Sequence, residues 1–244
     1  MRRFLILQLR PERDASDAEF AAFLAKGGLD ARCAHRIRLD AEPLPKGLDP
    51  ADYAGVIVGG GPGCVSDAPE EKSAEHARIE SAVLSLMPRI TAQDIPFLGC
   101  CYGIGILGKH LGAPVAKGRY GEPVGTAACA LTEAGRADPL MDGVPDRFDA
   151  FVGHKEALEA LPEGCAHLAS APSCPFQVVR HGHNVYATQF HPEADATVFE
   201  ERIEIYKHHG YFPSETAGDL IAMCRAAEVT APERILANFV RRYG

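Results

Sequence analysis

The sequence predicts an α/β protein built on a doubly wound, mostly parallel sheet with an antiparallel extension and C-terminal helices. Three observations predict this class. Short apolar runs alternate with amphipathic segments through the first half of the chain. Strand-like runs then cluster between residues 124 and 190, and three helical patterns follow residue 195.

In the first half of the chain, predicted strands alternate with predicted helices, except that a loop alone separates the second strand from the third. The predicted strands are residues 2–9, 31–39, 53–58 and 95–100. The predicted helices are residues 17–26, 69–87 and 102–111. Gly27 and Gly28 end the first helix, and Pro69 suits the first turn of the second. The proline-rich stretch 41–50 predicts a loop.

The second half is rich in strands before it becomes helical. Its predicted strands are residues 124–131, 147–152, 176–180 and 185–190, and its predicted helices are residues 197–208, 215–227 and 232–243. With 244 residues, of which 46% are hydrophobic, the chain can fill one sizeable core. We expect a single domain over residues 1–244, with residues 195–244 as a helical extension.

Composition excludes several classes of function. A net charge of −8 disfavours nucleic acid and anionic membranes as partners. The first residues are too short and too charged for a signal peptide, and no apolar run is long enough to span a bilayer. The eight cysteines are therefore expected to be reduced thiols in a cytoplasmic protein. Their spacing indicates no metal site, and we expect no cofactor.

The segment 96–103 carries the clearest chemical signal. Its sequence, Pro-Phe-Leu-Gly-Cys-Cys-Tyr-Gly, is a short apolar run that ends in a glycine, a thiol and a second glycine. This is the thiol form of the nucleophile elbow, a tight turn from strand to helix. Gly99 and Gly103 leave room for the strained turn, and Cys101 would be the nucleophile. The N-terminus of the helix that follows is expected to lower the pKa of this thiol.

A base and an anion hole are also predicted at strand ends. His191 follows the apolar run 184–190, and Glu193 is placed to hold its ring in one tautomer. The run 56–58 leads into a glycine-rich loop, residues 59–63, which can turn a backbone N–H towards negative charge. Sites in open parallel sheets gather at the carboxyl ends of the strands, so these pieces can meet in space.

These blocks resemble the class I glutamine amidotransferase family, in particular the free-standing glutaminases related to GMP synthase. The resemblance covers residues 53–193 and includes the glycine loop 59–63, the elbow 99–103, the segment 151–154 and the His-Pro-Glu block 191–193. It implies a flavodoxin-like glutaminase fold. It also implies hydrolysis of the glutamine side-chain amide to glutamate and ammonia through a γ-glutamyl thioester.

The resemblance assigns roles residue by residue. Cys101, His191 and Glu193 would be the catalytic triad, and the backbone N–H groups of Gly61 and Tyr102 would form the oxyanion hole. The residues that it places in the substrate pocket are Gly60, Gly105, His154 and Gln189. No metal is implied.

One departure from the family leaves alternatives open. Gly105 stands where the family has a glutamine that holds the substrate. A γ-glutamyl hydrolase or peptidase acting on conjugated substrates is therefore a second hypothesis, and a non-catalytic, partner-regulated subunit is a third. The chain has no recognisable synthetase domain, so an ammonia acceptor would either belong to another chain or not exist.

A nucleotide-binding function is the competing interpretation of the elbow helix. Residues 103–108 satisfy the pattern G-x-G-x-x-G between a strand and a helix. No acidic residue ends a following strand at the required distance, and this interpretation leaves Cys101 and the His-Pro-Glu block unexplained. We therefore favour cysteine chemistry.

Overall fold

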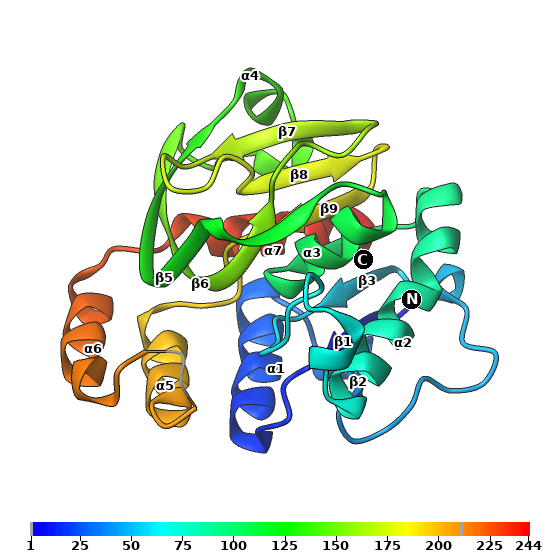
Figure 1. Cartoon of the computed structure of the whole chain (residues 1–244). Helices are drawn as coiled ribbons and strands as arrows, with labels where there is room; N and C mark the ends of the chain where they lie inside the picture. The colour runs from blue at the N-terminus through cyan, green and yellow to red at the C-terminus, as the bar shows by residue number, and fades with distance from the viewer. Residues whose placement is uncertain (1, 210–211) are drawn as a thin grey trace.

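A computed structural model describes residues 2–209 and 212–244, and in these residues a single nine-stranded sheet is flanked by helices (Figure 1). The strand order is β2-β1-β3-β4-β9-β8-β7-β5-β6. The fold class predicted from the sequence is confirmed. The two halves of the sheet differ in strand direction, and they meet at β9.

One half of the sheet is parallel. Its strands are β1 (Phe4–Gln8), β2 (Ala34–Arg38), β3 (Gly55–Val58), β4 (Phe97–Cys100) and β9 (Val185–Thr188). Neighbouring strands in this half all pair in parallel. The order, with the first strand between the second and third, is the flavodoxin-like arrangement. All five carboxyl ends therefore lie along one edge.

The other half of the sheet is antiparallel. Its strands are β5 (Val115–Leu131), β6 (Arg147–Leu158), β7 (Cys165–Ser170) and β8 (Val178–His181). β5 and β6 form a long hairpin with register shifts near Glu122, and β8 pairs antiparallel with β9. This half is the extension that the clustered strand patterns predicted.

Helices cover both faces of the parallel half, and the alternation of side chains along each strand decides which face they meet. Helices α1 (Arg13–Gly27) and α7 (Ala231–Tyr243) cover one face, where Phe4, Phe23 and Phe239 share a core. Helices α2 (Ala74–Ala92) and α3 (Tyr102–His110) cover the other, where Leu5 and Ile104 belong to a second core. Both cores consist mainly of apolar side chains, which explains the continuous hydrophobic runs of these strands.

Two more helices form a separate layer beside the β5–β6 hairpin. In Figure 1, α5 (Ala196–Tyr206) and α6 (Ala217–Ala226) stand next to one another, with α1 beside α5. A small third core joins them to β6 through Phe151, Phe199 and Ile203. A four-residue helix, α4 (Glu133–Arg136), precedes the β6 strand.

Several elements differ from the sequence prediction: β5 and β6 are longer than expected, some elements begin later, and one strand was not expected. The helix expected from residue 69 begins at Ala74, because the Ser73 hydroxyl accepts the His76 N–H and caps it there. The strand expected over residues 31–39 begins at Ala34, after a short 3₁₀ turn. Strand β7 was not predicted, because its half-buried residues show no clear alternation.

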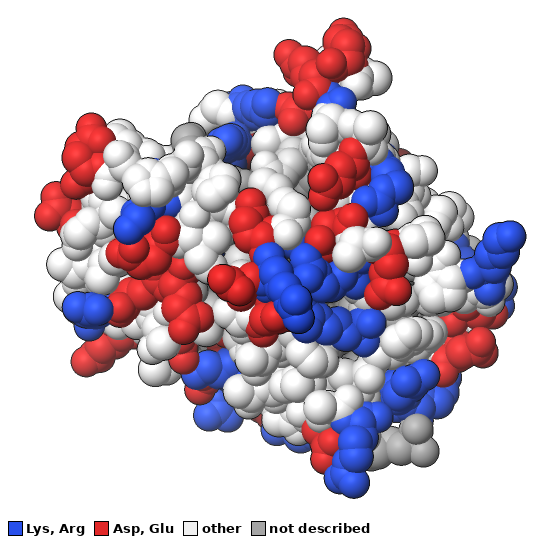
Figure 2. Space-filling model, turned by 90° about the horizontal axis from the view of Figure 1, so that it is seen from below, with Lys and Arg blue, Asp and Glu red and all other residues white. Residues whose placement is uncertain are grey.

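The described helices are all too short or too polar to cross a membrane. Figure 2 shows one face of the molecule, on which Lys and Arg side chains gather near the middle and Asp and Glu side chains border them. Both signs of charge therefore lie side by side on this face.

Candidate active site

The elbow turn lies between β4 and α3 and is strained at Cys101. Its backbone has φ 54° and ψ −91°, a conformation that costs a residue with a side chain about 1–3 kcal/mol. The Cys101 N–H donates to the Thr188 carbonyl at 2.8 Å, which ties the turn to the end of β9. Strain held in place by the surrounding sheet is what a nucleophile elbow requires.

The two glycines of the elbow differ in how much the turn needs them. A Cβ on Gly99 would lie 2.9 Å from the Gly103 backbone, so only glycine fits at this position. A Cβ on Gly103 would lie 3.7 Å from the Val58 carbonyl oxygen, which is an ordinary contact. The steric requirement expected at both positions therefore holds at Gly99 alone.

The surroundings of the Cys101 thiol favour its neutral form. Burial raises the pKa of this thiol to about 12, although the charge of Arg10 acts in the opposite direction. The pKa depression expected from the helix N-terminus is therefore outweighed. Within the described residues the sulfur has no hydrogen-bond partner, so a nucleophilic role for Cys101 would require a base.

His191 and Glu193 form a buried pair after β9. The His191 Nδ1–H donates to Glu193 Oε1 at 2.9 Å, and the two residues are 3% and 0% exposed. Burial lowers the pKa of His191, whereas that of Glu193 is held well below its usual range because His191 and Arg202 outweigh its burial. A neutral imidazole held by a carboxylate is a competent base.

Behind this pair lies a network of buried charges that the sequence did not reveal. Arg202 Nη2 donates to the same Glu193 oxygen at 2.6 Å and lies 3.7 Å from Glu19 Oε1. Arg10 Nε donates to Glu19 at 3.0 Å. All of these side chains are at least nine-tenths buried. They come from separate elements, and no local motif joins them.

The loop 59–63 after β3 needs glycine at two positions, because the side chains of His191 and His76 pack against it. A Cβ on Gly60 would lie 2.5 Å from His191 Cε1, so His191 packs directly on the loop. A Cβ on Gly63 would overlap the ring of His76, whose Nε2 is 2.9 Å from the Tyr102 hydroxyl. The loop that carries Gly61 is thus held between His191 and helix α2.

A narrow pocket of about 30 Å³ opens at Cys101. Gly61 and Tyr102, the residues expected to form the oxyanion hole, line it. Three of the four expected pocket residues also line it, namely Gly105, His154 and Gln189. The fourth, Gly60, lies instead against His191.

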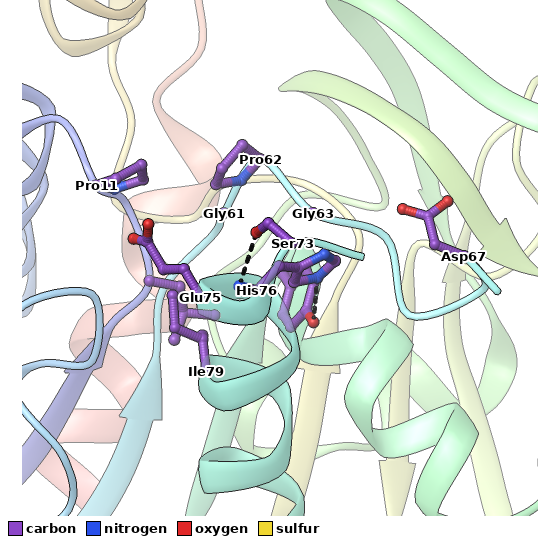
Figure 3. A pocket seen from close by; sticks show the side chains of 11 residues that line it. Pro11, Gly61, Pro62, Gly63, Asp67, Ser73, Glu75, His76 and Ile79 are labelled. Carbon is purple, nitrogen blue, oxygen red and sulfur yellow. Dashed lines mark hydrogen bonds between the residues drawn. The ribbon is translucent and has the colours of Figure 1, made fainter. Parts of the chain in front are cut away.

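A larger pocket of about 270 Å³ adjoins the other side of the glycine loop. Figure 3 shows it between the loop residues Gly61 and Gly63 and the start of α2, where Ser73, Glu75 and His76 face it. The two pockets share residues 61–63 and Tyr102 in their walls. A substrate larger than glutamine would find room in this second pocket.

Glu156 occupies the space that Gly105 leaves free. A Cβ on Gly105 would lie 3.0 Å from Glu156 Oε1. This carboxylate accepts hydrogen bonds from the Val65 N–H at 2.8 Å and the Ser66 N–H at 2.9 Å. It therefore ties β6 to the chain that follows the glycine loop. Since it comes from a distant strand, the elbow motif could not have indicated it.

A compact polar cluster surrounds His154, and its donor atoms are near enough to hold a metal. Donor atoms of Glu122, His154 and Cys174 lie within 4.8 Å of one another. Glu122 is already bonded to His154 Nε2 at 2.8 Å and to Gln177 Nε2 at 2.7 Å. Burial would raise the pKa of Glu122, but these bonds hold it below its usual value. The Glu122 carboxylate therefore has hydrogen-bond partners within the protein without an ion.

Comparison with known proteins places this arrangement in a family. The family model of class-I glutamine amidotransferases matches residues 17–207. The glutamine-hydrolysing GMP synthase of Thermosipho melanesiensis is 34% identical over 149 residues, which are 61% of this chain and 26% of that protein. One subunit of the glutamine-hydrolysing GMP synthase of Methanoculleus marisnigri is 28% identical over 165 residues, which are 66% of this chain and 78% of that subunit. The chain thus spans about a quarter of the length of the first of these curated relatives.

Solved structures agree in fold. A glutamine amidotransferase from Thermotoga maritima superimposes with a TM-score of 0.76 at 19% identity, covering 100% of this chain and 98% of that one. One from Methylobacillus flagellatus gives a TM-score of 0.71 at 19% identity, covering 100% and 96%. The family and the enzyme class predicted from the sequence are confirmed, and the chain belongs to the class-I glutamine amidotransferase family.

Proposed function

We propose that this protein hydrolyses the side-chain amide of glutamine, with Cys101 as nucleophile and His191 and Glu193 as base and orienting carboxylate. The observation that carries the proposal is that a strained cysteine and a buried histidine–glutamate pair follow two neighbouring parallel strands, at the same edge of the sheet. β4 and β9 are adjacent and parallel, and Cys100 pairs with Thr188 at their ends. The nucleophile and the base follow these two strands directly.

The reaction would proceed in two halves. His191 takes the proton of the Cys101 thiol as the sulfur bonds to the amide carbon, and it passes that proton to the nitrogen as the C–N bond breaks and ammonia leaves. Water then attacks the thioester carbon while His191 accepts its proton, the C–S bond breaks, and the proton returns to the sulfur. Glu193 steadies the imidazolium in both halves.

The oxyanion would be held by backbone N–H groups. Gly61 and Tyr102 line the pocket at Cys101, the first from the glycine loop and the second from the first turn of α3. Losing one such donor typically costs about 3 kcal/mol in the transition state. The packing of His76 on Gly63 supports a loop geometry that is formed before substrate arrives.

We further propose that the ammonia passes to an acceptor enzyme on another chain. The curated relatives are GMP synthases, and one of them is a single subunit of such an enzyme. The match covers 26% of the Thermosipho melanesiensis synthase, so most of that protein lies outside the matched region.

Replacing Cys101 tests the proposal directly. We expect Cys101→Ala to abolish ammonia release from glutamine and to abolish covalent trapping by an electrophilic glutamine analogue. Cys33→Ala removes a half-buried thiol at the amino end of β2, whereas Cys101 follows the carboxyl end of β4, and it should leave both signals unchanged. Turnover that survives in Cys101→Ala would refute the assignment of the nucleophile.

A second substrate class is favoured by the pocket of about 270 Å³ that adjoins the small one. In a γ-glutamyl conjugate, the group beyond the scissile amide could occupy it. Comparing ammonia release from glutamine with amine release from γ-glutamyl conjugates separates the two functions. A chain inactive on both, with Cys101 no more reactive than a free thiol, would support a non-catalytic role.

A further inference from the structure

Helix α5 presents two side chains to the catalytic pair. Phe199 and Arg202 lie three residues apart, so they share one face of the helix. The Phe199 ring stacks on Phe151 with centroids 4.8 Å apart and lies 6.2 Å from the His191 ring. Arg202 reaches the partner of that histidine, Glu193. The helix thus contributes an apolar wall and a charge to the same site.

The contact between Arg202 and Glu193 is unusually direct. Glu193 Oε1 accepts both the His191 Nδ1–H at 2.9 Å and the Arg202 Nη2–H at 2.6 Å. The Glu193 carboxylate is 0% exposed and the Arg202 side chain is 7% exposed, so water does not screen the pair. The orientation of the carboxylate is therefore set from two sides.

We propose that Arg202 is a positioning residue for the catalytic pair, which holds Glu193 in place and tunes the basicity of His191 from helix α5. The inference rests on the proposed role of Cys101 and His191. On this proposal, His191 is a competent base only when helix α5 is docked. Helix α5 follows the segment that carries the elbow and the His-Pro-Glu block.

The charges around the pair come from every element packed against it. They are Arg10 after β1, Glu19 on α1, Arg202 on α5 and the Cys101 thiol after β4, with the Tyr206 hydroxyl bonded to Arg10. The two arginines and the two buried glutamates balance in charge. Removing one arginine leaves one negative charge without a partner, which disfavours the loss of a proton from any neighbour.

The expected consequence has a definite sign. The Arg202 charge acts to lower the pKa of both the Cys101 thiol and His191. Without it, both groups keep their protons to higher pH. The ascending limb of the pH–rate profile should therefore move to higher pH, by about one unit.

The experiment measures the rate of Cys101 alkylation by iodoacetamide, and kcat/KM for glutamine, as functions of pH in the full chain. Arg202→Gln should move the ascending limb of both profiles upward by about one unit. In a Glu193→Gln background the same change should again move the limb upward, because the Arg202 charge acts directly on the thiol and on the imidazole. Arg225→Gln on α6 removes an exposed arginine paired with Glu200 and serves as the matched control.

Several outcomes decide the matter. A purely structural role would lower the rate equally at all pH values without moving the limb, and this result would overturn the proposal. If Arg202→Gln does not fold, Arg202→Lys keeps the charge without the planar fork; a smaller upward shift supports the proposal, and an unchanged limb with unchanged kcat overturns it. The alkylation profile reports on Arg202 even if glutamine is not the substrate.

Discussion

At the scale of single residues, the site combines a strained backbone with a thiol kept neutral by its surroundings. Cys101 has a positive φ of 54°, and burial raises its thiol pKa to about 12. The positive charge of Arg10 favours the thiolate, but its effect on the thiol pKa is smaller than the opposite effect of burial. In the proposed reaction the thiol must therefore give its proton to His191 once substrate is bound, so the placement of that ring matters.

The fit between His191 and the glycine loop yields a prediction. In Gly60→Ala the added Cβ would lie 2.5 Å from His191 Cε1 and 2.8 Å from Arg10 Nη2. We expect the imidazole to be displaced and kcat to fall by roughly 100-fold, since small misplacements of a catalytic group cost about that much. Steady-state ammonia release measures the effect.

A matched control exists in helix α6. At Gly218 an added Cβ would meet no atom within 4 Å. Gly218→Ala should leave kcat unchanged and raise the free energy of unfolding by about 0.5–1 kcal/mol, as expected for a helical glycine. Equal activity in the two alanine variants would contradict the contact between His191 and the loop.

At the scale of elements, neighbouring strands decide which segments meet. β4 and β9 are far apart in sequence, yet their parallel pairing brings the elbow and the His-Pro-Glu block to one edge. Helix α5 then closes the back of this edge through Phe199 and Arg202. The last helix, α7, has a different role, because it fills the core beneath β1 and β3.

The packing of α7 can be tested at Phe239. This ring is fully buried, lies 6.1 Å from the Phe4 ring between centroids, and touches the position of Gly55. Phe239→Ala should lower the free energy of unfolding by about 3–5 kcal/mol, measured in urea. Arg242→Ala on the exposed side of the same helix should change it by less than about 0.5 kcal/mol. A small effect at Phe239 would mean that α7 docks weakly.

At the scale of the whole molecule, buried titratable groups make the fold sensitive to acid. Burial lowers the pKa of His76 and His191, so the unfolded chain binds protons at these positions first as the pH falls below about 6.5. The pKa values of Glu193 and Glu122 are held low by their partners, so their contribution is lost below about pH 4.5. The histidines and the carboxylates therefore both lower the free energy of unfolding as the pH falls.

We therefore expect stability to fall in two stages on acidification. The free energy of unfolding in urea should decrease between about pH 7 and pH 5 because of the histidines, and decrease again below about pH 4.5 because of the carboxylates. His76→Gln should reduce the first stage. A free energy of unfolding that stays constant down to about pH 5 would contradict the burial of neutral imidazoles.

Much of the fold followed from local patterns, whereas several boundaries did not. The elbow strand and its helix were predicted because a glycine-flanked thiol after an apolar run is a signal carried by adjacent residues. Strand β7 was missed because its pairing with β8 and β5, rather than its own alternation, makes it a strand. The start of α2 was misplaced because Pro69 suits a helix start, while the cap that forms is Ser73.

By itself, the sequence determined the family and the fold class, and it indicated Cys101, His191 and Glu193 as the proposed triad, since these residues stand in short motifs that depend only on neighbouring residues. The tertiary structure alone decided what surrounds them. Arg202 beside Glu193 and Glu156 in the space left by Gly105 come from elements brought close only by the folded sheet. Burial, which exists only once the chain has folded, then decides the protonation of the thiol and of the imidazole, because the cost of a charge depends on the water that the whole fold excludes.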